Sequence, residues 1–319
     1  MSSIGTISVK DINFARDQIK RHIYLTPLEP SPQLSHEFSA EIHFKLENWQ
    51  RTGSFKLRGA LNKMLSLSEE ERNVGVVTAS VGNHGLGVAY AAKLFGIPGK
   101  IVVPEKASPA KVKALKSYDL QLIEHGRDYD EAEEHARELE KADGLIFVHA
   151  FSDPPIIAGQ GTVGLEIMEA LPDVHTIVVP VGGGGLVCGV AIAVKSMNPA
   201  VNVIGVQSEA SPAMVNSIRA GKVVETPIEE TVADGLAGRF VTELTLKMVQ
   251  DYVDDVVLVS EDAIKKAMKM IVESEHMLVE ASAAVGVAAF LEQKIGATPK
   301  CAIILTGRNV DVTVLKRIL

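Results

Sequence analysis

The amino-terminal part of the chain carries helical and extended hydrophobic patterns in turn. Residues 11–22 place apolar side chains at helical spacing, and Ser8 is a good N-cap for this run, so we expect a helix there. Residues 24–32 are rich in proline and predict a loop. Residues 41–47 alternate polar and apolar side chains, which is the pattern of a half-buried strand, and residues 55–65 predict a second helix.

From residue 74 onward, short apolar strands alternate with amphipathic helices, after a charged break at residues 68–73. We expect strands at residues 74–79, 100–103, 120–123, 175–181, 201–206 and 301–305. We expect helices at residues 86–95, 109–118, 129–141, 161–170, 186–197 and 261–273. This alternation favours parallel sheets that are covered by helices.

The length of 319 residues and the 46% of hydrophobic side chains are enough for two domains with real cores. We expect an α/β fold in which each domain is a mostly parallel twisted sheet covered by helices. Residues 71–147 are expected to form a small domain, and residues 1–70 together with 148–319 a large one. The loop at residues 149–155 then returns the chain to the first domain.

Composition limits the classes of partner. The net charge of -8 argues against a protein that binds nucleic-acid phosphates. Cys188 and Cys301 lie far apart in apolar runs, which favours two core thiols over a disulfide or a metal cluster. No apolar run reaches membrane-spanning length, and residues 1–5 do not begin a signal peptide, so we expect a cytoplasmic protein without a membrane partner.

Lys56 is the first candidate for chemistry. Thr52 and Gly53 predict a turn, and Ser54 is a good N-cap, so that Lys56 falls in the first turn of the helix. The positive end of the helix dipole disfavours the ammonium form there, and burial would do so more strongly. A lysine with a depressed pKa is a nucleophile that can form a Schiff base with an aldehyde. The alternative is an ordinary surface lysine.

A run of four glycines, Gly182, Gly183, Gly184 and Gly185, lies between an apolar strand and the helix that starts near Leu186. Glycines let the backbone approach an anion closely, and the helix end offers unpaired N–H groups, so a phosphate is the expected ligand. A dinucleotide fingerprint is a rival, but its last position holds Val187 where glycine or alanine is preferred. A flexible connection without a ligand is the remaining alternative.

A second loop at a strand end contains Ser80, Val81, Gly82, Asn83 and His84. Its backbone N–H groups, the Ser80 hydroxyl and the Asn83 amide suit a substrate carboxylate or a phenolate oxygen. The alternative is a helix cap with an incidental histidine.

Residues 54–60, with Glu47 and Thr52 before them, resemble the cofactor-lysine signature of the serine/threonine dehydratase group. This group, which includes catabolic threonine dehydratases and serine racemases, belongs to the tryptophan-synthase-like, fold type II pyridoxal-phosphate enzymes. The resemblance covers nearly the whole chain through several motifs in the same order. It implies a fold type II enzyme with pyridoxal 5'-phosphate on Lys56, and a homodimer.

The resemblance also implies a role for each motif. The expected cofactor-binding residues are Phe55, Lys56, Asn83, Gly182, Gly183, Gly184, Gly185, Leu186, Glu280 and Thr306. The expected substrate-binding residues are Ser80, Val81, Gly82, Asn83 and His84. Thr306 would face the pyridine nitrogen, although a hydroxyl after a strand is also typical of an ordinary turn. Glu280 would lie near the cofactor, although a lone carboxylate is more often a helix cap or a solvated residue.

Several positions depart from the pattern of the group. Val81 stands where the resembled racemases have a serine that protonates the carbanion, so racemisation is disfavoured. Gln207 and Ala213 stand where metal-stimulated relatives carry acidic ligands, so no metal is expected at that site. Arg308 replaces a glycine, and it would favour an acidic substrate side chain if it pointed inward.

The function expected from the sequence is a dehydratase, or ammonia-lyase, that converts L-threonine or L-serine into a 2-oxo acid and ammonia, with Lys56 as the catalytic base. A serine racemase, a β-replacement synthase and a dehydratase of 3-hydroxyaspartate would use the same lysine and glycine loop. From another class, a small-molecule binding protein could use the glycines to hold a nucleotide.

Overall fold

The computed structural model describes residues 7–318, so that the amino-terminal residues 1–5 considered above lie outside its range. It contains a six-stranded sheet in the order β1-β2-β10-β7-β8-β9, in which only β1 runs antiparallel to its neighbour. The strands are β1 (Leu28–Pro30), β2 (Glu41–Lys45), β7 (Thr176–Pro180), β8 (Asn202–Ser208), β9 (Asp255–Val259) and β10 (Lys300–Ile304). The expected mostly parallel sheet is therefore present.

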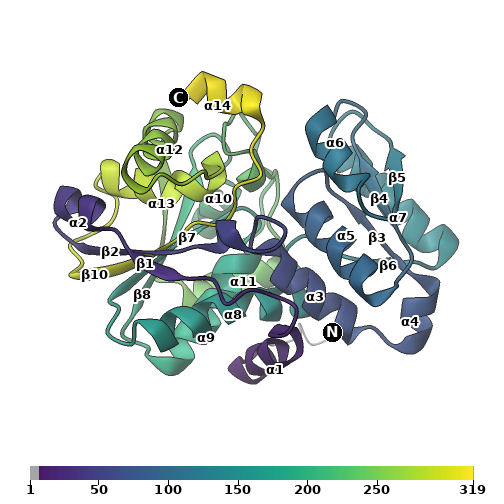
Figure 1. Ribbon diagram of the computed structural model, residues 1–319, viewed down its shortest axis with the longest axis horizontal. Coiled ribbons are helices and arrows are strands. Elements are labelled where there is room, and N and C mark those ends of the chain that lie inside the picture. Colours follow the sequence, from purple (N-terminus) through teal and green to yellow (C-terminus); the bar gives the residue numbers. More distant parts are fainter. Residues whose placement is uncertain (1–6, 319) are drawn as a thin grey trace.

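A second, four-stranded sheet has the order β5-β4-β3-β6 and is parallel throughout. Its strands are β3 (Val76–Ala79), β4 (Gly99–Val103), β5 (Gln121–Glu124) and β6 (Ile146–Phe147). Figure 1 shows the two sheets in separate lobes. Between them lies α3 (Lys56–Ser66), which packs against α5 (Asn83–Phe95) on one side and α8 (Pro154–Ala170) on the other.

The other helices surround the two sheets. They are α1 (Val9–Ile19), α2 (Pro32–Phe38), α4 (Glu69–Val74), α6 (Pro109–Leu115), α7 (Tyr129–Asp143), α9 (Gly185–Met197), α10 (Ala213–Ala220), α11 (Glu243–Tyr252), α12 (Glu261–Glu275), α13 (Ala281–Leu291) and α14 (Val312–Ile318), with short 3-10 turns at Glu47–Trp49 and Asp234–Leu236. No helix in residues 7–318 is long and apolar enough to cross a membrane.

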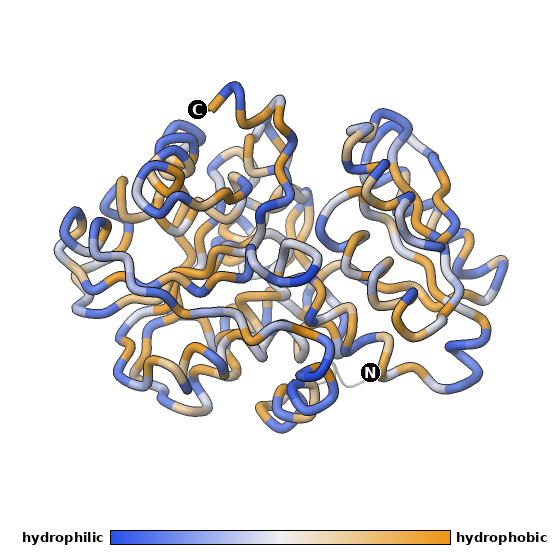
Figure 2. The backbone as a smooth tube through the Cα atoms, viewed as in Figure 1, coloured by the Kyte–Doolittle hydropathy of each residue, from blue (hydrophilic) through white to orange (hydrophobic). Residues whose placement is uncertain are grey.

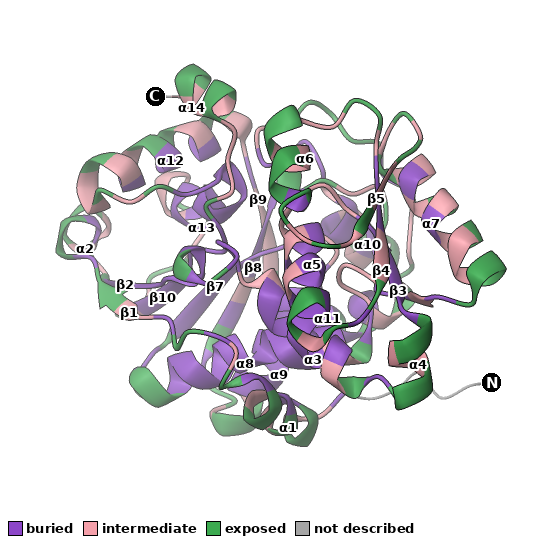
Figure 3. Cartoon of the chain, turned by 45° about the vertical axis from the view of Figure 1, so that its right-hand side comes forward, coloured by how far each residue is buried: buried purple, intermediate pink, exposed green. Residues whose placement is uncertain are grey.

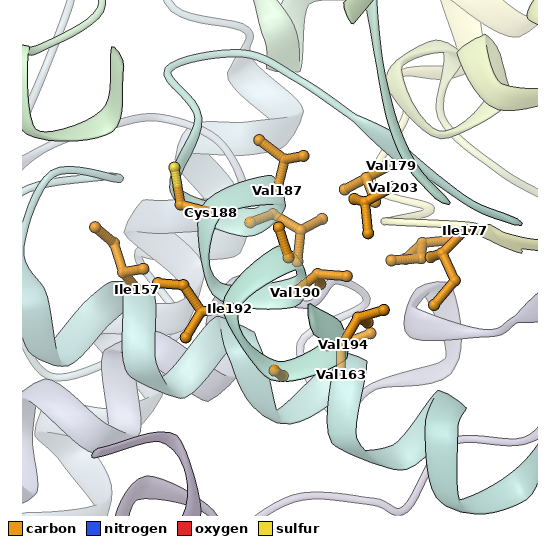
Figure 4. Close-up of a cluster of buried hydrophobic side chains, with 14 of the residues drawn as sticks. Ile157, Val163, Ile177, Val179, Val187, Cys188, Val190, Ile192, Val194 and Val203 are labelled. Atoms are coloured by element: carbon orange, nitrogen blue, oxygen red, sulfur yellow. The ribbon is translucent and has the colours of Figure 1, made fainter. Parts of the chain in front are cut away.

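The main core lies on both faces of the six-stranded sheet. Ile177 and Val179 of β7 point to α8 and α9, whereas Val178 points to the opposite face, where α12 and α13 pack. Figure 4 shows the first of these clusters, with Val190 and Val194 of α9 among its members. Figure 2 shows hydrophobic residues concentrated along the strands in the interior of the molecule. Figure 3 shows that most residues of α8 and α9 are buried.

Three expectations about helix boundaries were wrong. Ser54 does not cap α3, because the helix begins at Lys56 with Phe55 at the N-cap position, and the Ser54 hydroxyl has no partner within residues 7–318. The charged break contains a short helix, α4, which Ser68 and Glu71 stabilise through a capping box. Helix α8 begins at Pro154 instead of residue 161, because proline suits the first turn, where no N–H partner is needed.

Candidate active site

The site is built around the amino-terminal end of α3. The Phe55 N–H donates to the Thr306 carbonyl at 3.1 Å, and the Arg308 N–H donates to the Gly53 carbonyl at 2.9 Å. The turn before Lys56 is therefore held against the loop that follows β10. The sequence placed both segments among the candidates, and the structure brings them into contact.

The Lys56 amine points away from solvent at this junction. It is half-buried, and Nζ donates to the Ala150 carbonyl oxygen at 2.9 Å. Burial lowers the pKa of Lys56 to about 8, while the negative charge of Glu280 acts in the opposite direction. A larger share of this amine is therefore uncharged near neutral pH than of an exposed lysine, which is the property required of a nucleophile or a general base.

A chain of amide and carboxylate groups joins three elements next to this amine. The Asn83 amide nitrogen, at the start of α5, donates to Glu280 Oε1 at 2.7 Å and to Oε2 at 3.0 Å. The Asn309 amide nitrogen donates to Asn83 Oδ1 at 2.7 Å. Burial raises the pKa of Glu280 to about 7, although the Asn83 hydrogen bond opposes the shift. Glu280 occupies the N-cap position of α13, but its side chain turns to Asn83 and does not cap the helix.

The glycine loop leaves no room for side chains. A Cβ on Gly183 would lie 2.5 Å from atoms of the Phe151 ring, and a Cβ on Gly185 would lie 2.6 Å from the Phe151 carbonyl oxygen. Gly184 has φ +99°, a left-handed conformation that side-chain-bearing residues rarely adopt. No side chain within residues 7–318 caps α9, so the N–H groups of its first turn are free for an anion.

The second candidate loop divides into two parts. The Asn83 side chain bonds Glu280 and Asn309, as described above. In contrast, His84 is buried behind the loop, where its Nε2 lies 3.0 Å from both Thr78 Oγ1 and the Val148 carbonyl. Burial lowers the pKa of His84 to about 3, and the positive charge of Lys56 adds to this effect, so the ring is neutral. The Gly82 N–H donates to Ser80 Oγ at 3.2 Å.

Four buried hydroxyls near these segments have no partner within residues 7–318, and they belong to Thr52, Ser54, Ser282 and Thr306. Unpaired polar atoms in a buried position are rare unless a ligand completes them. With an amine of lowered pKa, an uncapped helix start and a glycine loop nearby, they fit a cofactor that has an aldehyde, a phosphate and a polar ring. From the sequence, Ser54 was expected to cap a helix and Ser282 was given no role, because an isolated serine carries no signal for ligand binding.

The structure shows where two residues that depart from the pattern of the group, Gln207 and Arg308, lie. Gln207 Oε1 accepts the backbone N–H groups of Met214 and Val215 at 3.1 Å each, and thereby caps α10. Residues 7–318 contain no group of three or more His, Cys, Asp or Glu side chains that could hold a metal ion. Arg308 is exposed, so its side chain does not have the inward position that would favour an acidic substrate.

Comparison with known proteins gives consistent results. Residues 19–307 match the family described as pyridoxal-phosphate dependent enzyme. The L-threonine ammonia-lyase of Thermotoga maritima is 47% identical over 98% of this chain and 78% of its own length. The catabolic L-threonine dehydratase TdcB of Escherichia coli K12 is 40% identical over 98% of this chain and 96% of its own.

Solved structures resemble the whole chain. The structure of maize serine racemase superposes with a TM-score of 0.93 at 37% identity, and covers 98% of this chain and 97% of its own. The expected α/β fold with two parallel-dominated sheets, of the fold type II kind, is therefore confirmed.

Proposed function

The chain belongs to the family of pyridoxal-phosphate-dependent enzymes, and from this premise we propose that it is an ammonia-lyase for L-threonine and L-serine. The substrate loses water from its α- and β-carbons, and hydrolysis of the resulting enamine gives a 2-oxo acid and ammonia. The observation that carries the proposal is a half-buried lysine amine of lowered pKa beside a loop with free helix N–H groups. Relatives of 40% and 47% identity that are named for this activity support it.

The cofactor would be held by groups from the turn before α3, the glycine loop and the loop after β10. Lys56 would bind its aldehyde carbon, the N–H groups of residues 182–186 would hold its phosphate, and the Thr306 hydroxyl would serve its ring nitrogen. Phe55 lies beside the amine, with Nζ 5.3 Å from its ring centroid. Asn83 would interact with the ring oxygen, and Glu280 would lie near the cofactor. When bound, pyridoxal phosphate supplies an electron sink for negative charge at the substrate α-carbon.

The residues of the chain would then move the protons. The Lys56 amine takes the α-proton of the substrate, because its pKa near 8 lets it act as a base at neutral pH. The loop of residues 80–84 holds the substrate carboxylate through backbone N–H groups, the Ser80 hydroxyl and the Asn83 amide. His84 contributes by fixing the loop from behind, since its Nε2 already has partners.

Val81 favours elimination over racemisation in this proposal. Its side chain is half-buried and packs against the apolar cluster of Ile101 and Leu115. It offers no proton to the opposite face of the α-carbon. The structural similarity to a serine racemase keeps that activity as the alternative to be tested.

We also propose that residues 1–70 and 148–319 form the large domain and residues 71–147 the small one, because the four strands of the smaller sheet fall within residues 76–147. The enzyme would act as a homodimer, as the resemblance to the dehydratase group implies, and we propose the cytoplasm as its location. Its expected partner is an amino-acid substrate, with no nucleic acid or membrane.

The test is to incubate the protein, loaded with pyridoxal phosphate, with L-threonine, L-serine and 3-hydroxyaspartate in turn. We expect 2-oxo acid from threonine and serine, no D-serine on chiral separation, and little product from 3-hydroxyaspartate. Formation of D-serine without 2-oxo acid would replace the proposed activity by racemisation, and absence of every product would overturn it.

A further inference from the structure

A short segment between the two sheets contacts both halves of the proposed cofactor site. We call residues 149–152 the crossover segment, because it follows β6 of the small sheet and precedes α8. The Ala150 carbonyl accepts the hydrogen bond from Lys56 Nζ at 2.9 Å. Phe151, the next residue, lies so close to the glycine loop that only glycine fits opposite its ring. The position of this segment therefore affects the amine and the loop together.

The far end of the segment is anchored beside the same loop. Ser152 Oγ lies 2.7 Å from Thr242 Oγ1, and Thr242 caps α11. Thr245, on the first turn of α11, packs against Gly184. A Cβ added to Gly184 would lie 3.1 Å from the Cβ of Thr245. The Phe151 ring therefore packs against the glycine loop, and the Ser152 hydroxyl bonds a residue next to it.

The shape of the crossover segment depends on the side chain of His149. Its Nδ1 accepts the backbone N–H groups of Phe151 at 3.2 Å and of Ser152 at 3.0 Å. Within residues 7–318 these two N–H groups have no other acceptor. The imidazole also packs edge-on against the Phe151 ring, with centroids 4.5 Å apart and an interplanar angle of 88°. One ring nitrogen therefore holds two consecutive residues in a tight turn.

This arrangement requires a neutral imidazole with its proton on Nε2, because a protonated Nδ1 cannot accept. Burial lowers the pKa of His149 to about 4, and the nearby positive charges of Arg137 and Lys56 lower it further, while Asp153 raises it. The acceptor is therefore available throughout the neutral range.

We propose that His149 is a positioning residue, which holds the crossover segment so that the Ala150 carbonyl meets the Lys56 amine and Phe151 closes over the glycine loop. The inference rests on the proposed function for the roles of Lys56 and of the loop. Loss of the Nδ1 acceptor would leave two N–H groups without a partner and let Ala150 and Phe151 move together, since they are adjacent.

The test compares two amide substitutions that differ by one methylene. In His149→Asn, Oδ1 takes the place of Nδ1, whereas in His149→Gln the amide lies one atom further out, near the place of Nε2. The apoproteins are titrated with pyridoxal phosphate, and the affinity and the visible absorption of the bound cofactor are recorded against pH. Far-ultraviolet circular dichroism and melting without cofactor check that each variant is folded.

We expect His149→Asn to bind the cofactor within about threefold of the wild type, with the same absorption maximum. We expect His149→Gln to lose about tenfold or more in affinity and to shift the pH midpoint of the absorption change. Equal behaviour of the two variants, whether both like the wild type or both weakened, would overturn the inference. If His149→Gln does not fold, His149→Asn decides, because a tenfold loss there is incompatible with the inference.

The same titration separates this inference from the proposed function. A wild-type protein that does not bind pyridoxal phosphate at all would contradict the proposed function. A wild-type protein that binds the cofactor, with both variants behaving alike, contradicts only the role of His149.

Discussion

The Lys56 amine is subject to two opposing influences. Burial disfavours its charged form, and the carboxylate of Glu280 favours it. The balance leaves the pKa at about 8, whereas the helix dipole alone would contribute only about 1 kcal/mol or less at such a position. The environment of the side chain, more than its place in the helix, therefore explains its lowered pKa.

A first prediction concerns the titration of this amine. In apoprotein, labelling of Lys56 by trinitrobenzenesulfonate should reach half its maximal rate near pH 8, and Glu280→Gln should move that midpoint to lower pH, because a negative neighbour is removed. Peptide mapping across a pH series measures both. A midpoint near the ordinary value of 10.5, or a rise in the variant, would be incompatible with the site described.

A second prediction concerns Val81. Val81→Ser places a hydroxyl where a proton donor is missing. The rate at which Val81→Ser forms D-serine from L-serine should therefore exceed the rate of Val81→Ala by about a hundredfold. This factor is the lower end of what a positioned proton donor contributes. Val81→Ala controls for the loss of the valine side chain from its apolar cluster. Equal D-serine formation in the two variants would show that position 81 does not decide between the reactions.

Residue types at characteristic positions made Lys56, the glycine loop and Asn83 candidates from the sequence, and the resemblance to the dehydratase group added Thr306. The orientation of a side chain was not accessible in the same way. His84 turns into the protein because Thr78 and Val148, which come from two separate strand ends, provide its partners. Such contacts between distant segments leave no local pattern.

Helix α3 is held from behind by a buried network of ion pairs. The Arg58 guanidinium, fully buried, donates to Glu47 through Nε and Nη2, at 2.8 Å each, and to Glu166 of α8 through Nη1 at 2.6 Å and Nη2 at 2.8 Å. Lys45 Nζ adds a third cationic contact, 2.6 Å from Glu166. Because Arg58 lies two residues after Lys56, this network fixes the end of α3 that carries the amine.

A third prediction follows from this network. Arg58→Met leaves two buried carboxylates without their main partner, so the free energy of unfolding should fall by about 3–5 kcal/mol. Arg16→Ala, which breaks an ion pair with Glu169 at the surface of the same helix α8, should change it by less than about 1 kcal/mol. Urea unfolding of both apoproteins makes the comparison, and a similar small loss in each would contradict the importance of the buried network.

Helices with a clear polar face, such as α7 and α12, were located from the sequence to within a few residues. Helix α13 was not, because its residues are almost all apolar or small and give no helical period. Strand β6 is only two residues long, too short for a pattern. Packing against the sheets decides the structure of α13 and β6. The local sequence contains no pattern that predicts this packing.

Neutral buried histidines tie the stability of the whole molecule to pH. Burial lowers the pKa of His84 to about 3 and that of His149 to about 4, from an ordinary value of 6.5. Below pH 6.5 the unfolded chain takes up protons that the folded chain does not, so both groups favour folding above that pH and lose this contribution as the pH falls. Glu280 acts in the opposite sense between pH 4.5 and about 7, because its folded-state pKa is raised.

A fourth prediction isolates one of these contributions. Between pH 7 and pH 5, the unfolding free energy of the His149→Asn apoprotein should fall by about 1–2 kcal/mol less than that of the wild type, because asparagine does not titrate. Denaturant unfolding at the two pH values gives the change in unfolding free energy for each protein. Subtracting the change in the variant from that in the wild type cancels the contributions of the carboxylates, which both proteins share. Identical pH dependence would mean that His149 is not kept neutral by the fold.

The alternation of strands and helices predicted two parallel-dominated sheets, and the structure contains them. The order of strands within each sheet was not predictable, since it depends on which faces find complementary helices. Strand β1 is an example, because residues 24–32 were expected to form a loop, whereas Leu28–Pro30 pair antiparallel with β2 at the edge of the sheet.

Everything proposed for catalysis depends on the amine of Lys56. The most direct test is to load the protein with pyridoxal phosphate, reduce it with borohydride, and locate the added mass by peptide mapping, with Lys56→Ala as control. The account predicts that the cofactor is found on the peptide that contains Lys56, and that the variant carries no label and has no turnover. A label on another lysine, or full turnover in Lys56→Ala, would contradict it.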